Sequence, residues 1–183
     1  MYRSIFRLLA VVAVVFAPLS SSAAAGIYMG SITSADRAHA NALQPTGSAS
    51  TCATPKPVPG TLTNSFLYRY DSYGETNTSG APRCVTVQLA VGATTASDGA
   101  FFAAYLDSFN ASNLAANYLG DAGIRVAPGT TRSYSVNVPA GRRIVVVVEE
   151  YTPGTGVPSY TLTITGIVPT PVLVRSFVGK RES

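Results

Sequence analysis

The chain has 183 residues, including 16 Gly, 12 Pro and no Trp, and its formal net charge is +4. Its length allows one domain with appendages. Residues 52–167 nevertheless contain seven basic and seven acidic residues, so the excess positive charge lies nearer the chain ends. Because an uncharged domain lacks the basic surface that phosphate backbones require, the composition disfavours nucleic-acid binding.

Residues 1–25 have the three parts of a secretory signal peptide. Arg3 and Arg7 form the basic start, Leu8–Phe16 forms the apolar centre, and the stretch ends in the small residues SSSAAA. We expect cleavage before Gly26. The apolar centre is shorter than the about 20 residues that a membrane span requires. The sequence therefore predicts a secreted, extracellular or cell-surface protein without a stable membrane span after cleavage.

Residues 26–51 are rich in Ala, Ser and Thr and show no sustained periodicity, which predicts a flexible N-terminal lead-in. His39, the single histidine of the chain, lies within them. A catalytic base or a metal ligand must be held in position beside its partners. No cluster of ligand-type residues surrounds His39 in the sequence, so we expect a solvated linker histidine.

Cys52 and Cys84 are the two cysteines of the chain. In an oxidising compartment, two thiols most simply form one structural disulfide. Redox catalysis usually uses a closely spaced C-x-x-C pair, and structural zinc uses four ligands. The sequence therefore predicts a Cys52–Cys84 disulfide that fixes the proline-rich segment after Cys52 to the strand that begins at Cys84.

Alternating or continuous apolar runs, separated by Gly, Pro, Asn and Asp, recur through the central part of the chain and are typical of β-strands. The expected strands cover residues 64–70, 84–91, 101–106, 131–138, 144–148 and 160–164. Turn signals at these intervals indicate an antiparallel β-sandwich. The predicted fold is an all-β antiparallel sandwich, with the sandwich domain over residues 52–167.

The stretch Thr131–Glu150 (TRSYSVNVPAGRRIVVVVEE) is interpreted as a β-hairpin. Its first half alternates, the sequence PAG supplies a turn, and Ile144–Val148 is a β-branched run expected to be covered on both faces. We expect Glu149 and Glu150 to meet solvent at the end of the strand. Adjacent strand residues point to opposite faces, so the two carboxylates are not expected to share a glycosidase-like site.

Two further segments have distinct patterns. In residues 109–123 (FNASNLAANYLGDAG), the four-residue spacing of Leu114 and Tyr118 predicts one helical turn over the core. Residues 168–183 begin with VPTPVLV, which is interpreted as a linker followed by the start of a further strand. Because a strand does not stand alone, we expect this tail to be the start of another, truncated module.

The sequence from Cys52 to Gly166 resembles the bacterial pre-peptidase C-terminal-like domains and related modules of large secreted proteins. The resemblance is carried by the segments AAYLDSFNASNLAANYLGDAG, YSVNVPAGRRIVVVVEE and SYTLTITG. It implies a non-catalytic jelly-roll-like sandwich that accompanies enzymes, adhesins or other repeats. Many relatives have a second cysteine pair, which this chain lacks. The tail PTPVLVRSF also resembles the start of a fibronectin-type-III-like module.

Motifs for chemistry are absent from the sequence: there is no G-x-S-x-G, no P-loop and no H-E-x-x-H. Asp71, Asp107 and Asp121 are the candidates for a calcium site, although capping of turns is the commoner role of aspartate in loops. No other cofactor is expected. The tyrosines are candidates for binding carbohydrate or protein, with strand packing as their commoner role.

These observations lead to the expectation of a non-enzymatic secreted accessory module. Its expected partners are a surface glycan or neighbouring protein domains, and its expected role is attachment, interaction or support of a neighbouring domain. The alternative is a fragment of an extracellular hydrolase or adhesin whose active part lies outside this chain. A free-standing carbohydrate-binding protein is the third hypothesis.

Overall fold

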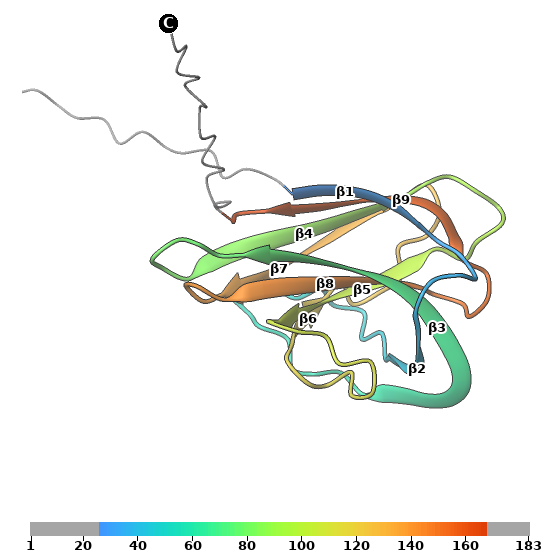
Figure 1. The fold of residues 1–183 in the computed structure, drawn as a ribbon, viewed down its shortest axis with the longest axis horizontal. Coiled ribbons are helices and arrows are strands. Elements are labelled where there is room, and N and C mark those ends of the chain that lie inside the picture. Colours follow the sequence, from blue (N-terminus) through green and yellow to red (C-terminus); the bar gives the residue numbers. More distant parts are fainter. Residues whose placement is uncertain (1–25, 168–183) are drawn as a thin grey trace, which may run out of the picture.

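The computed structural model describes residues 26–167, which form two antiparallel β-sheets and no helix. Figure 1 shows the strands as two layers. The strands are β1 (Gly26–Ile32), β2 (Ala38–Leu43), β3 (Thr61–Thr76), β4 (Arg83–Val91), β5 (Ala100–Leu106), β6 (Tyr118–Asp121), β7 (Thr131–Val138), β8 (Arg143–Glu150) and β9 (Val157–Thr165). One sheet has the order β1-β9-β4-β7 and the other has the order β2-β3-β8-β5-β6. The predicted all-β antiparallel sandwich is confirmed.

The prediction of a flexible lead-in over residues 26–51 is wrong, because this segment supplies one strand to each sheet. β1 pairs with β9, and Gly26 lies opposite Ile164. β2 pairs with β3, and His39 lies opposite Tyr68. In Figure 1, β1 runs beside β9, whereas β2 lies inside the curve of the long strand β3. The alanines of β2 and the glycines of β1 have low strand propensity, but pairing with distant strands overrides it.

The predicted hairpin between β7 and β8 is also wrong. β7 pairs with β4, whereas β8 pairs with both β3 and β5 in the other sheet. The connecting turn crosses between the sheets, and its backbone is bonded to Asn77 at the end of β3. Gly141 N–H donates to Asn77 O at 2.8 Å, and Asn77 N–H donates to Arg142 O at 2.9 Å. These bonds fix the turn to a third strand, so the two flanking strands diverge.

The β-branched run of β8 is covered on both faces, as predicted. Ile144, Val146 and Val148 pack in the main core between the sheets. Val145 and Val147 face the opposite way, into a second apolar cluster that includes Leu43, Phe101, Tyr105 and Leu114. Burial of both faces explains why no polar residue interrupts the run.

The second apolar cluster is covered by the loop between β5 and β6. Leu114 in this loop is 5% exposed, so it packs over the core as expected. The predicted helical turn is not formed. The segment instead consists of turns, and Tyr118 begins β6, which pairs with β5. Two asparagines in the loop accept backbone N–H groups two residues further on, which favours turns over a helix.

The predicted disulfide between Cys52 and Cys84 is present, with the two Cα atoms 5.8 Å apart. It connects the segment after β2 to the start of β4. Asn137 on β7 reinforces the junction, because its Nδ2 donates to Cys52 O at 2.8 Å. The predicted signal peptide (residues 1–25) and C-terminal tail (residues 168–183) lie outside the described residues. Within the described range, no helix is long and apolar enough to cross a membrane.

Candidate ligand pocket beside a buried ion pair

A pocket with a cavity volume of about 200 Å³ lies at one end of the five-stranded sheet. Strands β2, β3, β5 and β8 contribute side chains to it. The lining consists of four aliphatic or proline residues, three aromatic residues and two glutamates: Ala42, Leu43, Pro45, Leu62, Tyr68, Phe101, Tyr151, Glu149 and Glu150. A concave apolar surface with a few polar groups is the usual form of a small-ligand site.

Glu149 borders this pocket and forms an ion pair with His39. Its Oε2 atom lies 2.8 Å from His39 Nε2, and the side chains of Glu149 and His39 are 9% and 0% exposed. On the other side of the ring, His39 Nδ1 lies 3.3 Å from Ala40 O. Both neighbours are acceptor oxygens, and the carboxylate charge close to Nε2 favours the imidazolium form.

The expectation of a solvated His39 is therefore wrong. The imidazole lies among the rings of Tyr68, Tyr70 and Phe109, with centroid distances of 6.2, 5.3 and 5.6 Å. Burial by itself lowers the pKa of His39, but the hydrogen bond and negative charge of Glu149 outweigh it and raise that pKa from 6.5. The charged form of the histidine is thus favoured by its carboxylate partner.

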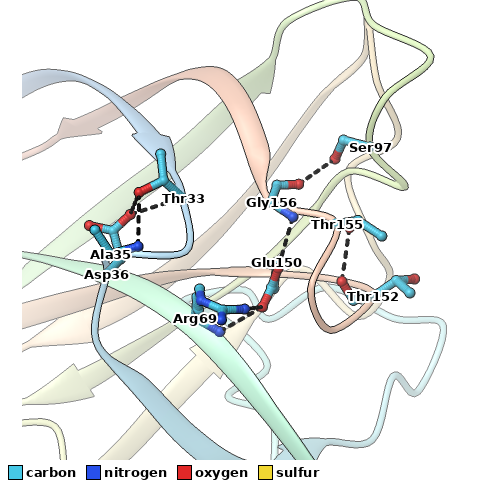
Figure 2. A network of polar contacts seen from close by, with 9 residues as sticks. All are labelled: Thr33, Ala35, Asp36, Arg69, Ser97, Glu150, Thr152, Thr155 and Gly156. Atoms are coloured by element: carbon cyan, nitrogen blue, oxygen red, sulfur yellow. Dashed lines mark hydrogen bonds and ion pairs between the residues drawn. The ribbon is translucent and has the colours of Figure 1, made fainter.

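Glu150 is fully buried, which contradicts the expected solvent-exposed end of β8. Figure 2 shows it between Arg69 on β3 and Gly156 in the loop after β8. Its Oε1 accepts Arg69 N–H at 3.0 Å, and its Oε2 accepts Gly156 N–H at 2.8 Å. Arg69 Nη1 lies 3.5 Å from the same Oε1. Ser97 Oγ donates to Gly156 O at 2.8 Å, which fixes the loop from its other side.

The two adjacent glutamates have different partners, in line with their expected opposite orientation. Both residues belong to the lining of the same pocket, although the Glu150 side chain is fully buried and bonded elsewhere. Figure 2 also shows the turn between β1 and β2, in which Asp36 Oδ2 accepts Thr33 N–H at 2.6 Å.

The three candidate calcium ligands lie in separate polar contacts. Asp71 accepts a hydrogen bond from Tyr160, and Asp107 binds Arg142. Asp121 lies 2.5 Å from Lys56 Nζ and accepts Tyr118 Oη–H at 2.5 Å. Between residues 26 and 167 there is no group of three or more His, Cys, Asp or Glu that could hold a metal ion.

These contacts shift the titration of two groups in the directions expected from their partners. The Arg142 side chain beside Asp107 lowers the pKa of that carboxyl. Burial, together with the hydrogen bond to Asp71, raises the pKa of Tyr160 well above 10.0. Both aspartates therefore act as acceptors in contacts that stabilise neighbouring strands and turns.

The candidate tyrosines mainly pack, as the strand pattern suggested. Tyr68, Tyr105, Tyr134 and Tyr160 are buried, whereas Tyr70, Tyr73, Tyr118 and Tyr151 are partly buried. Tyr68 and Tyr151 also line the pocket. Arg125 lies over the ring of Tyr151, with its Cζ atom 5.4 Å from the centroid. Two members of the tyrosine set thus pack against their neighbours and also line the pocket.

The described residues define a disulfide-containing antiparallel β-sandwich whose candidate site is the pocket at one end of the five-stranded sheet. No family model matches the chain, and no curated protein matches it. Among solved structures, a CBM35 from Cellvibrio japonicus Abf62 is similar with a TM-score of 0.29 and 17% identity, over 79% of this chain and 95% of that chain. A likeness at this level assigns no function.

Proposed function

We propose that this protein is a secreted, non-catalytic β-sandwich module that binds a carbohydrate in the pocket. One observation carries the proposal: Tyr68, Phe101 and Tyr151 line a cavity together with Glu149. Aromatic rings provide apolar area for the C–H face of a sugar. The carboxylate of Glu149 provides an acceptor for hydrogen bonds from its hydroxyl groups.

The placement of the ionisable groups supports binding without catalysis. A general acid or base must reach the proton that it transfers. The His39 side chain has 0% exposure, and Glu150 has 0% exposure with both oxygens bonded to protein groups. Both groups therefore suit holding neighbouring strands together better than proton transfer to a substrate.

The disulfide supports the secretion part of the proposal, because structural disulfides persist mainly in oxidising compartments. Residues 1–25 provide the matching export signal in the sequence. The resemblance of residues 52–166 to pre-peptidase C-terminal-like domains supports an accessory role beside a neighbouring domain. In that role the pocket would hold the protein, and anything attached to it, on a glycan surface.

The proposal predicts that blocking the pocket abolishes retention on carbohydrate. Leu62 lines the pocket and is 42% exposed, so Leu62→Arg places a bulky cation at its mouth with little effect on the core. We expect at least about tenfold weaker binding, or about 1.4 kcal/mol. The measurement is retention of the full chain on insoluble plant, fungal and bacterial polysaccharides, followed by calorimetry with matching oligosaccharides.

Leu67→Arg is the matched control, because Leu67 is on the same strand and 57% exposed but is not part of the pocket lining. It should bind within about twofold of the wild type, since exposed substitutions rarely change the fold. Equal losses in the two variants, or no retention of the wild type on any of these polysaccharides, would refute carbohydrate binding in this pocket.

A further inference from the structure

Strand β2 forms one wall of the pocket and lies at the edge of its sheet. Within the sheet order, β3 is its neighbour on one side, and no other described strand pairs with it. The pairing with β3 is interrupted between Ala40 and Ala42, where Asn41 has a φ of 68°. Ala42 and Leu43 line the pocket just beyond this irregularity. An interrupted edge strand depends on side-chain contacts for its position.

The His39–Glu149 ion pair supplies such a contact, because it connects β2 to β8 across the intervening strand β3. The distance between Nε2 and Oε2 is 2.8 Å, and both side chains are almost completely buried. The contact thus attaches an edge strand to the central strand of the sheet. Its strength depends on the charge of the imidazole.

Among the described residues, Glu149 is the charged group that faces His39. Strand β3 presents the hydroxyl-bearing rings of Tyr68 and Tyr70, and the loop after β5 presents the apolar ring of Phe109. Strand β5 presents Tyr105 toward Glu149, where burial raises the pKa of the phenol far above 10.0 and keeps it neutral. Glu150 is already compensated by Arg69. Loss of the His39 proton therefore leaves the Glu149 carboxylate without a cationic partner.

The direction of the resulting pH effect follows from the protonation of His39. With β2 in place, burial lowers the pKa of His39 and Glu149 raises it by more, so the net result lies above 6.5. With β2 detached, the imidazole is solvated and titrates near its ordinary value. The attached strand binds the proton more tightly, so attachment is favoured in acid and weakens as the pH rises from 6.5 through the pKa of the attached form.

We propose that the His39–Glu149 contact is a pH-sensitive latch that holds strand β2 against the sheet and keeps the pocket wall formed, and that its release in alkaline conditions opens the pocket. The latch itself is inferred from the position of β2 at the sheet edge and from its contact with β8. Its effect on ligand retention rests on the proposed carbohydrate-binding function. A ligand held at acidic pH would then be released as the pH rises.

Hydrogen exchange of the full chain as secreted tests the latch without any ligand. Amide exchange is measured between pH 6 and 9 and corrected for the intrinsic rate. Above pH 6.5, the opening constant of residues 38–43 should rise by up to about tenfold per pH unit until the pKa of the attached form is passed. The amides of Ile144–Val148 in β8 should keep a constant opening constant. A flat profile for Ala42 and Leu43 would overturn the proposal.

His39→Gln provides the second arm, because glutamine can donate a hydrogen bond to Glu149 but does not titrate. Its β2 amides should show an opening constant that is independent of pH, whereas the same slope as the wild type would also overturn the latch. The wild-type series remains decisive if this variant does not fold. Failure of the exchange experiment leaves carbohydrate binding intact, and failure of polysaccharide retention leaves the latch intact.

Discussion

Replacing Phe102 by alanine is expected to lower the free energy of unfolding by about 4 kcal/mol. Phe102 on β5 is 0% exposed and lies in the main core. Its ring centroid is 4.9 Å from that of Tyr134 on β7, so the pair joins the two sheets. The alanine variant loses both the transfer free energy of the ring and the contacts around the cavity that remains. Equilibrium unfolding in urea measures the difference.

Phe66→Ala is the control for this substitution, because Phe66 on β3 is 59% exposed. Its effect should be within about 0.5 kcal/mol of zero, as for most exposed positions. The comparison holds the chemistry of the substitution constant and changes the environment. A loss below about 1 kcal/mol at Phe102 would contradict the packing of β5 against β7.

Removal of the disulfide is expected to have an effect of similar size. The bridged cysteines are separated by 32 positions in the sequence. Closing a loop of this length restricts the unfolded chain, and the double substitution Cys52→Ala and Cys84→Ala should lower the free energy of unfolding by about 3.5 kcal/mol. Guanidinium unfolding of the oxidised wild type and of the double variant measures this loss.

Reductant gives an independent check of the same bond. It should lower the unfolding midpoint of the wild type toward that of the double variant and leave the double variant unchanged. Both substitutions are made together, because a single one would leave a reactive thiol. An unchanged wild-type midpoint under full reduction would mean that the cross-link contributes nothing to stability.

The sequence patterns located the strands that are regular and well buried. β4 and β9 alternate between apolar and polar residues because one face of each packs in the core. β8 lacks alternation because it is covered on both faces. The disulfide was also predictable, because the chain has two cysteines. In each case the signal is local, or depends on residue type alone.

The pairing of these strands could not be predicted from these local patterns. The sequence PAG between β7 and β8 suggested a hairpin, but nothing in it shows that Asn77 bonds both sides of this turn. β1 exposes Ile27 and Met29 and directs Tyr28 inward, so its apolar side chains do not mark the buried face. Long-range pairing decided both cases, and a single sequence carries little information about it.

Most of the candidate site could not be predicted either, because it also depends on long-range strand pairing. His39 lies 110 positions before Glu149 in the sequence, and their contact depends on the pairing of β2, β3 and β8. Glu149 and Glu150 were expected to meet solvent because glutamate is rarely buried without a partner. Their partners exist, but they come from β2, β3 and a turn. The alternation in AHANAL, which places His39 on one face, was the available signal.

The pairing of β1 with β9 brings the two ends of the sandwich together. Gly26 lies opposite Ile164, and directly opposed Cα atoms in antiparallel strands are about 5 Å apart. A domain with adjacent ends can be inserted into a surface loop of a host protein without stretching either connection. For the same reason, circular permutants made by joining these ends through a short glycine linker should keep both sheets. The register of β1 thus allows this sandwich to be inserted into different host proteins.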